Sequence, residues 1–373
     1  MKESVAAFVV FAAFALRALA QCPDYVRTNY AVSGPTRSIV TADFNGDGKL
    51  DLLAGINDSS GKVMLFPGNG DGTFASPANI STSIPFVWSM VASDFNGDGR
   101  ADVAVTNEAT VLAILLGNGD GTFTTSRFTV SEADDLFDLT AADLNGDGVS
   151  DLAMLSSNAN AVSIRFGRGD GTFGPSTLYS VGTVSRGIVA GDFNGDAKAD
   201  LAVSSLGSHT VSMLLNHGDG TFATAAPYAV NGAPNTIAAA DFNGDGKLDL
   251  ATGITTTAAV LLNNGNGTFA PEVQYPTGIS PTAIAAADFD RDGKADIATA
   301  NQSTGNISLL LGKGNGTFNT AIHYPVGTTP WGIALGDFKR NGRVGLAIAN
   351  FGSNNVSVML DRCVTPRRRA VRQ

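Results

Sequence analysis

The 373-residue sequence is poor in the residues that most often carry out catalysis or form disulfide frameworks. It has three histidines, two cysteines and two tryptophans, and only 16% of its residues are charged. Apart from residues 5–16, no apolar run approaches the roughly 20 residues that a helix needs to cross a bilayer. His209, His217 and His323 stand in no recognisable pairing with a nucleophile. These shortages argue against a disulfide-rich fold, a membrane-spanning protein and a histidine-based enzyme.

Glycine and aspartate are abundant, and they recur together in a nine-residue motif. In the copy at residues 241–249, oxygen-bearing side chains stand at positions one, three, five and nine, namely Asp241, Asn243, Asp245 and Asp249. Calcium takes six to eight oxygen ligands, which alternate residues of a tight loop can supply. The carbonyl of Lys247 would add a ligand, and Gly246 would allow a positive φ. The motif predicts a calcium loop, but Thr252 at position twelve replaces the glutamate that closes an EF-hand.

The motif recurs along the whole chain. Its seven copies follow one another at intervals of 51, 49, 49, 49, 47 and 49 residues and start at Asp43, Asp94, Asp143, Asp192, Asp241, Asp288 and Asp337. The first six copies are followed by a glycine-rich turn that ends in Thr-Phe, at Phe74, Phe123, Phe173, Phe222, Phe269 and Phe318. Asp-Gly and Asn-Gly dipeptides between short apolar runs indicate β-hairpins. Each unit is therefore expected to form four short antiparallel strands.

A unit of this length with four strands predicts a β-propeller, because such units bury their faces only against one another in a closed ring. The expected fold is all-β, a seven-bladed β-propeller of four-stranded antiparallel blades. Small residues before each loop, as at residues 237–240, fit an innermost strand near the axis. The phenylalanines of the loops and turns are expected to pack between blades. The seventh copy has only three strands, and residues 25–33 are expected to supply the fourth from the N-terminus.

The loops, turns and period together resemble FG-GAP/VCBS-type repeats, the family that builds the integrin α-subunit propeller and many secreted bacterial propellers. The resemblance covers residues 24–363. It implies that ligands bind the face opposite the calcium loops, where the copies differ from one another. The family includes binding and adhesion modules, so the resemblance specifies the fold far better than the function.

Six of the seven loops keep the oxygen ligands, and about six bound calcium ions are expected. The predicted ligands, with the position-seven residue contributing its carbonyl, are Asp43, Asn45, Asp47, Lys49 and Asp51; Asp94, Asn96, Asp98, Arg100 and Asp102; Asp143, Asn145, Asp147, Val149 and Asp151; Asp192, Asn194, Asp196, Lys198 and Asp200; Asp241, Asn243, Asp245, Lys247 and Asp249; and Asp288, Asp290, Asp292, Lys294 and Asp296. Ala197 replaces the position-six glycine of the fourth loop and should weaken that site. In the seventh loop, Lys339, Asn341 and Gly345 replace ligands, and the Lys339 ammonium is expected to lie against Asp337. Six calcium ions would nearly cancel the formal net charge of −10, so the low isoelectric point says little about partners.

The two ends of the chain suggest export and closure of the ring. Residues 1–20 have the pattern of a secretion signal, with an apolar run and an Ala-Leu-Ala end. Residues 21–363 would form the propeller, and the basic residues 364–373 a solvated tail. Alignment of the repeats places Cys22 and Cys363 two positions apart across the seam, where a disulfide would close the ring. Two unpaired thiols are the alternative.

A candidate ligand site lies six residues before each loop, close to the mouth of the central channel. The residues there are Arg37, Trp88, Phe137, Arg186, Asn235, Thr282 and Trp331. Aromatic rings stack on sugars or peptides, and the arginines could bind a carboxylate or sulfate. Of these residues, Arg37, Trp88, Phe137, Arg186 and Trp331 are the predicted ligand-binding set. The alternative is that the rings only plug the channel mouth.

The sequence favours a secreted, monomeric binding module that recognises an extracellular glycan and no nucleic acid. Protein–protein adhesion of the integrin type is the second hypothesis, and a polysaccharide-processing enzyme is the third. An enzyme would need acids at the channel mouth, where only Glu132, Asp134, Asp135 and Asp138 are expected, all in one loop. The tripeptide of residues 168–170, Arg-Gly-Asp, occupies a variable position of a glycine-rich turn and is interpreted as part of that turn.

Overall fold

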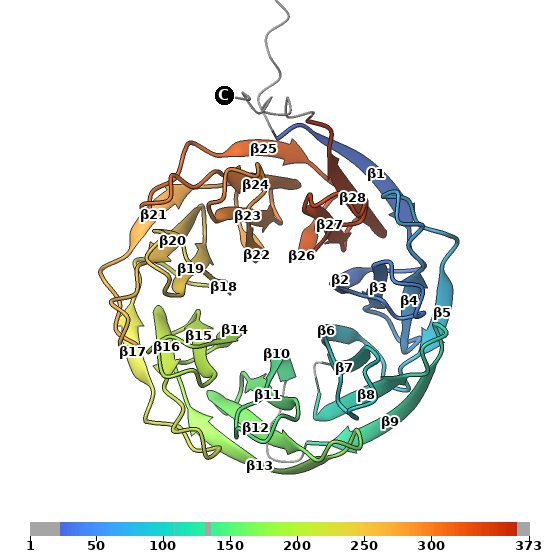
Figure 1. Cartoon of the computed structure of the whole chain (residues 1–373), viewed down its shortest axis with the longest axis horizontal. Helices are drawn as coiled ribbons and strands as arrows, with labels where there is room; N and C mark the ends of the chain where they lie inside the picture. Colours follow the sequence, from blue (N-terminus) through green and yellow to red (C-terminus); the bar gives the residue numbers. More distant parts are fainter. Residues whose placement is uncertain (1–22, 108, 131–135, 364–373) are drawn as a thin grey trace, which may run out of the picture.

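The computed structural model describes residues 23–107, 109–130 and 136–363, and these form a closed ring of seven β-sheets (Figure 1). Each sheet has four antiparallel strands, and no helix occurs in the described residues. A membrane-spanning helix is accordingly not found in this part of the chain. The structure confirms the predicted all-β, seven-bladed propeller.

The first four blades follow one another in chain order, each written from the axis outward. Blade one contains β2 (Thr36–Ala42), β3 (Asp51–Ile56), β4 (Lys62–Phe66) and β5 (Ala78–Ser81). Blade two contains β6 (Val87–Ser93), β7 (Asp102–Asn107), β8 (Val111–Gly117) and β9 (Phe123–Thr129). Blade three contains β10 (Leu136–Ala142), β11 (Asp151–Ser156), β12 (Ala161–Gly167) and β13 (Phe173–Ser180). Blade four contains β14 (Ser185–Gly191), β15 (Asp200–Ser205), β16 (Thr210–Leu214) and β17 (Ala226–Ala229).

The remaining three blades complete the ring. Blade five contains β18 (Thr236–Ala240), β19 (Asp249–Ile254), β20 (Thr257–Leu261) and β21 (Val273–Pro276). Blade six contains β22 (Pro281–Ala287), β23 (Asp296–Asn301), β24 (Asn306–Leu310) and β25 (Ile322–Pro325). Blade seven contains β26 (Pro330–Gly336), β27 (Gly345–Asn350), β28 (Asn355–Asp361) and, from the other end of the chain, β1 (Tyr25–Ala31).

Burial within a blade follows the distance from the axis. The second strand of every blade is buried along all six residues, because neighbouring blades cover both of its faces. The innermost strands surround the open centre, as Figure 1 shows, and their small residues let the blades converge there. This agrees with the assignment of residues 237–240 to an innermost strand. The outermost strands alternate between exposed and partly buried residues.

Paired phenylalanines join neighbouring blades, as the sequence predicts. The loop residue Phe44 in blade one lies 5.8 Å from the turn residue Phe123 in blade two, measured between ring centroids. The pairs formed by Phe95 with Phe173, Phe193 with Phe269, Phe242 with Phe318, and Phe338 with Phe74 repeat this contact at 5.5–6.2 Å. Each pair buries aromatic area between two blades, so the phenylalanines serve the core and not a ligand site.

The two faces of the ring differ in what they carry. The loops between the first and second strands and the Thr-Phe turns between the third and fourth strands lie on one face, which we call the loop face. The connections between blades and the turns between the second and third strands form the opposite face, the variable face. On the loop face, Gly121 N–H donates to Phe44 O at 3.1 Å and Gly316 N–H donates to Phe242 O at 2.9 Å. Thus the turn of one blade is hydrogen-bonded to the loop of the blade before it.

The N-terminal strand closes the ring. β1 pairs antiparallel with β28, with Tyr25 opposite Asp361 and Ala31 opposite Asn355. The N–H of Asp24 donates to Asp361 Oδ1 at 3.0 Å, and the N–H of Arg362 donates to Asp24 O at 2.9 Å. This confirms the predicted closure. Cys22 lies outside the described residues, so the Cys22–Cys363 disulfide stays a prediction.

A buried ion pair lies at the same seam. Arg343, at position seven of the seventh loop, pairs with Asp361 at the end of β28. The side chain of Asp361 is 3% exposed and that of Arg343 is 15% exposed. Asp361 Oδ1 also accepts the N–H of Cys363 at 2.9 Å. Blade seven therefore contains its own buried carboxylate and its own cation.

Replacement of Arg343 by methionine should destabilise the protein by about 3–5 kcal/mol, because it leaves the Asp361 carboxylate buried without its cation. Chemical denaturation would measure the loss. The matched control is Lys294→Met, which removes an exposed lysine at the same loop position and should cost little stability. Equal losses in the two variants would contradict the assigned role of Arg343.

Candidate functional site

The first residue of each loop folds the loop around its own carboxylate. In blade one, Asp43 Oδ1 accepts the N–H groups of Gly46 at 2.7 Å and Asp47 at 3.1 Å. Asp43 Oδ2 accepts the N–H of Gly48 at 2.7 Å. Asp94, Asp143, Asp192, Asp241 and Asp288 accept the N–H groups of positions four and six in the same way in the next five loops. These bonds curl the chain so that position three returns towards position one.

The ninth residue of each loop is a buried aspartate that ties the loop to its blade. Asp51 is 0% exposed, and its carboxylate accepts the N–H of Phe44 at 3.0 Å and of Gly68 at 2.7 Å. Phe44 belongs to the loop, and Gly68 opens the Thr-Phe turn of the same blade. Five further aspartates share this burial and these two bonds: Asp102, Asp151, Asp200, Asp249 and Asp296.

Burial raises the pKa of each of these six carboxyls, and the carboxylates at nearby loop positions raise it further. The pKa of Asp151 rises to about 6 and that of Asp296 to about 7. The two backbone N–H groups on each carboxylate act in the opposite direction, because they stabilise the charged form. The charged groups of the loop that act on each position-nine carboxyl are thus other carboxylates, which are negative.

Loop six shows most directly how a cation would fit. One carboxylate oxygen from each of Asp288, Asp290 and Asp296 lies within 4.8 Å of the others. Three hard oxygen donors around one point match the preference of calcium. The other five intact loops have an asparagine in place of Asp290, which supplies an amide oxygen. The residues at positions one, three and nine thus fit a calcium ion, and they would hold it together with further loop oxygens.

The position-five aspartates are exposed, and in five of the six loops the aspartate pairs with the side chain at position seven. Lys49 Nζ lies 2.9 Å from Asp47 Oδ2, and Lys294 Nζ lies 2.6 Å from Asp292 Oδ2. Arg100, Lys198 and Lys247 approach Asp98, Asp196 and Asp245 at 3.5–3.7 Å. Val149 makes no such contact, because it is apolar. These pairs are exposed, and each contributes little to stability.

Two loop positions require a left-handed backbone. At position six, Gly48, Gly246 and Gly293 have φ of 75°, 82° and 86°, and Ala197 has φ of 64°. A Cβ at any of these three glycines would meet nothing within 4 Å, so the requirement is conformational and not steric. Position four also has positive φ, which the sequence analysis missed. It is glycine in loops one to five and Arg291, with φ of 66°, in loop six.

The seventh loop differs from the other six, and one expectation about it is wrong. Asp337 still accepts the N–H groups of Asn341 at 3.0 Å and Gly342 at 2.6 Å. Lys339, however, forms no salt bridge with Asp337, and its methylene groups lie beside Gly72. Hydrogen bonds from Thr73 lower the pKa of Asp71, and the charge of Lys339 lowers it further. The cation that neutralises a buried carboxylate in this blade is Arg343, at position seven of the same loop, which pairs with Asp361.

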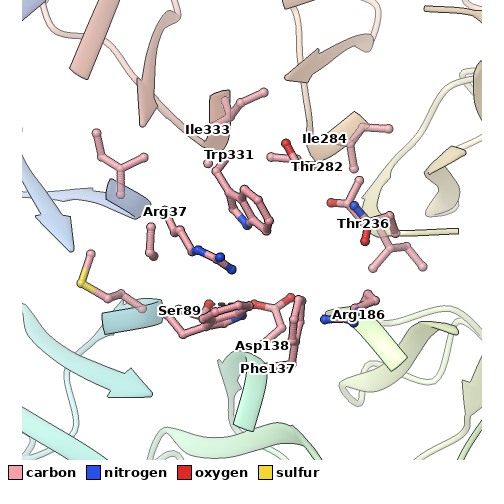
Figure 2. Close-up of a pocket in the computed structure, with 18 residues that line it drawn as sticks. Arg37, Ser89, Phe137, Asp138, Arg186, Thr236, Thr282, Ile284, Trp331 and Ile333 are labelled. Carbon is pink, nitrogen blue, oxygen red and sulfur yellow. Dashed lines mark hydrogen bonds between the residues drawn. The ribbon is translucent and has the colours of Figure 1, made fainter. Parts of the chain in front are cut away.

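The seven residues that precede the loops by six positions all line one cavity at the channel mouth, on the variable face (Figure 2). The cavity has a volume of about 230 Å³. The innermost strands or the residues just before them carry these residues, so that one side chain from each blade faces the axis. The structure thus brings together the whole predicted ligand-binding set, with Asn235 and Thr282.

Arginines stack on the aromatic rings in this cavity. The Arg37 guanidinium carbon lies 3.6 Å from the ring centroid of Trp88 and 4.0 Å from that of Trp331. Arg186 lies in the same way over Phe137 at 3.9 Å, and Phe137 contacts Trp88 edge to face at 5.0 Å. Such cation–π contacts hold the guanidinium groups in place. Trp88 is buried and so forms part of a plug, whereas Trp331 remains partly exposed to the cavity.

A partly buried carboxylate, Asp138, completes the cavity. It lies in β10 and not in a loop as expected, directly after Phe137. Asp138 accepts a hydrogen bond from Ser89 Oγ at 2.8 Å, which Figure 2 shows, and one from Ile188 N–H at 3.3 Å. Burial raises the pKa of Asp138 to about 6. Glu132, Asp134 and Asp135 lie outside the described residues.

Two other motifs are used locally. Asp170 of the Arg-Gly-Asp tripeptide accepts the N–H and the hydroxyl of Thr172 at 2.9 and 2.6 Å, which agrees with its interpretation as a turn residue. His323 Nδ1 lies 3.0 Å from Ser308 Oγ, but Ser308 is buried and accepts N–H groups from Gly278 and Asn301. This serine is therefore not placed for nucleophilic attack on a substrate.

Several solved structures share the fold. A lectin from Agrocybe aegerita, described as recognising non-reducing terminal N-acetylglucosamine, matches with a TM-score of 0.58 and 21% identity over 86% of each chain. Virginiamycin B lyase from Staphylococcus aureus matches with a TM-score of 0.63 and 14% identity over 90% of this chain and 99% of the lyase. BBS1N, in a complex with ARL6DN, matches with a TM-score of 0.63 and 13% identity over 92% of this chain and 97% of BBS1N. At these identities the likeness concerns the fold alone.

The sequence comparisons are more specific about family. No curated protein shows significant sequence similarity to the chain. The FG-GAP-like repeat, by contrast, matches six times, at residues 43–105, 94–154, 151–203, 203–252, 250–299 and 288–347. These matches run without a gap from the first aspartate-rich loop to the second strand of blade seven, and they agree with the blades of the structure. The chain therefore belongs to the FG-GAP-like repeat family.

Proposed function

We propose that the protein is an exported, calcium-stabilised propeller that binds an extracellular glycan, as a monomer and without catalysing a reaction. The observation that carries this proposal is the cavity at the channel mouth, where aromatic rings and arginines from separate blades meet. Export is inferred from residues 1–20, which lie outside the described residues. An oxidising compartment would also permit the Cys22–Cys363 disulfide.

The calcium part of the proposal rests on the donor set of the six loops. Each loop places a buried, position-nine carboxylate next to further oxygen donors, and loop six brings three carboxylates within 4.8 Å. When bound, the ion would offset the repulsion among these groups. Because the position-nine aspartate also holds Phe44 and Gly68 in blade one, calcium would strengthen the contact between a loop and its blade.

The glycan part of the proposal rests on the lining of the cavity. Trp331 offers a partly exposed ring, and Thr236 offers a hydroxyl group near it. Asn235 and Thr282 offer acceptor oxygens, because their side-chain donors are hydrogen-bonded to backbone carbonyls. Sugars are bound by this combination of an aromatic platform and convergent polar groups. A volume of about 230 Å³ suits a single sugar unit better than a drug-sized ligand. The similar fold of the N-acetylglucosamine-specific lectin supports a glycan, although the lyase shows that the fold also supports other functions.

A protein ligand is the second candidate, because the variable face also has exposed apolar side chains. Phe86 is 46% exposed and Ile279 is 47% exposed, and both lie in connections between blades. BBS1N, which shares the fold, was crystallised in complex with another protein. An enzyme has less support, because Asp138 is the one predicted acid of the channel mouth within the described residues, and it is already hydrogen-bonded.

Removal of calcium with a chelator should lower the melting temperature of the protein strongly. Each calcium-loaded loop would contribute about 2.7 kcal/mol of stability when free calcium is at 100 times its dissociation constant.

A matched pair of variants tests the assignment of the loops. Asp241→Asn alters loop five and should reduce the calcium-dependent rise in melting temperature, whereas Asp337→Asn alters the seventh loop and should leave that rise unchanged. Melting curves that coincide with and without chelator would contradict calcium binding.

Replacement of Ala197 by glycine should stabilise the calcium-bound protein by about 1 kcal/mol, because Ala197 has a left-handed backbone that glycine adopts without a Cβ clash. Denaturation in saturating calcium would measure the gain. Ala199→Gly, two residues later and without a positive φ, is the control and should destabilise. A loss of stability in the Ala197→Gly variant would contradict the assigned strain.

Glycan binding should change the intrinsic tryptophan fluorescence, because both tryptophans of the protein lie at the channel mouth. In a fluorescence screen of soluble oligosaccharides that includes N-acetylglucosamine-terminated chains, we expect at least one to bind. Calorimetry should then show that Trp331→Ala binds this oligosaccharide at least tenfold more weakly than the wild type. Phe86→Ala, which removes an exposed ring outside the cavity, should bind like the wild type. Calorimetry that finds no glycan for the folded protein would favour the protein-ligand candidate.

A further inference from the structure

Loops six and seven carry arginines where the other loops have glycine. Position four is Arg291 in loop six and Arg340 in loop seven, with φ of 66° and 53°. In loop one the same position is Gly46, with φ of 74°. An arginine is strained in this conformation, and the turn itself does not need its side chain. Two adjacent blades thus each have an arginine at a position where it costs stability. This suggests that the two arginines have a role outside the turn.

The two arginines extend across the seam of the ring. Arg291 Nη2 lies 3.6 Å from the point that a Cβ on Gly342 of loop seven would occupy. Arg340 Cδ lies 3.4 Å from the corresponding point at Gly70, in the Thr-Phe turn of blade one. Lys339 lies beside that same turn. The cations of blades six and seven therefore form an arc over the loop face that reaches blade one.

These cations are available to a partner. Arg291, Arg340 and Lys313 are exposed, Lys339 is half-buried, and none of the four forms a salt bridge among the described residues. In contrast, the position-seven cations on this face, such as Lys294, are held in ion pairs. Lys313 lies on the same face, in the Thr-Phe turn of blade six, where its N–H donates to Thr317 O. We name Arg291, Lys313, Lys339 and Arg340 the basic arc.

Loop six lies next to the blade in which the two ends of the chain meet. The Thr-Phe turns of blades two, three, five and six are each hydrogen-bonded to the loop of the blade before, as Gly121 is to Phe44. Blade seven has no Thr-Phe turn, because its third strand ends at Asp361 and its fourth strand comes from the N-terminus. Among the described residues, loop six is therefore not covered by such a turn, and Arg291 is exposed.

The composition of the arc indicates the kind of partner. The large exposed apolar side chains of the described residues, Phe86, Leu178, Val273 and Ile279, lie in blade connections or outermost strands and not among the loops. Without apolar groups the arc could not insert into a membrane, and without aromatic rings it offers no platform for bases. Exposed arginines remain suited to the carboxylates or sulfates of a polymer.

We propose that the basic arc binds an acidic polysaccharide on the loop face, opposite the channel mouth. The inference rests in part on the proposed calcium binding, because a calcium ion would cancel two of the four negative charges of loop six, and Lys294 together with the arc would outnumber the two that remain. Such a polymer would lie along the seam and contact Arg291 and Arg340 together. The protein would then have two carbohydrate sites of different chemistry on its two faces.

The test is binding of the whole mature protein to heparin, a sulfated polysaccharide, in calcium, with neutral dextran as a negative control. Arg291→Gly/Arg340→Gly restores the residue of loops one to five and relieves strain, so its melting temperature should be unchanged or higher. Heparin binding by this variant should depend less on salt than binding by the wild type. The slope of log affinity against log salt concentration should be smaller in magnitude by about 2. Arg127→Thr/Arg168→Asn removes two exposed arginines elsewhere and should leave both affinity and slope nearly unchanged.

Four outcomes separate this inference from the proposed function. Loss of heparin binding in the glycine variant alone supports the arc, whether or not chelator changes the melting temperature. Equal losses in the two double variants would show that only net charge matters and would overturn the arc, as would a wild type that does not bind heparin. Trp331→Ala should retain heparin binding, and its loss there would assign the polymer to the channel mouth instead.

Discussion

The structure depends on a carboxylate that is buried at the same point of six blades. The position-nine aspartate is the first residue of the second strand, and it accepts N–H groups from the loop before it and from the turn that follows the third strand. This one side chain therefore fixes three segments of a blade. A charge buried in this way is unfavourable unless a cation is near. The aspartates and asparagine that surround it create the place for that cation, so the loop and the blade are parts of one arrangement.

Blade seven has a cation of the chain itself beside its buried carboxylate. Its position nine is Gly345, and the buried carboxylate comes instead from Asp361 in the third strand. Arg343 supplies the cation. This blade is also the one that joins the two ends of the chain, and its ion pair needs no metal. The pair agrees with the proposal that a bound cation accompanies the buried carboxylate in each of the other six blades.

The repeat period of the sequence predicted most of the fold, but it did not predict every backbone conformation within the loops. Seven copies of a four-strand unit gave the blades, and the missing strand of the seventh copy gave the closure by β1. The position-six glycines were recognised because calcium loops require them, and Ala197 does have a positive φ. The positive φ at position four was missed, although five glycines there and two arginines carried the signal.

The candidate sites were harder to predict because they form between blades. The position six residues before each loop predicted all seven residues of the channel mouth, because a closed ring brings equivalent positions of its blades together. It could not show that Arg37 lies between Trp88 and Trp331, because those residues come from blades one, two and seven. Asp138 was assigned to a loop, although it directly follows Phe137 in a strand. The pairing of Arg343 with Asp361 joins the loop to the end of a strand 18 residues away, which no local motif encodes.

The most direct test of this account is the number of calcium ions that one chain binds. Equilibrium dialysis of the metal-free protein against calcium, with metal analysis of the retained protein, would give that number at saturation. The account predicts about six ions, one for each buried position-nine aspartate, and none for blade seven. A value near zero would contradict the assignment of the loops, and a value of seven would contradict the replacement of the metal by Arg343.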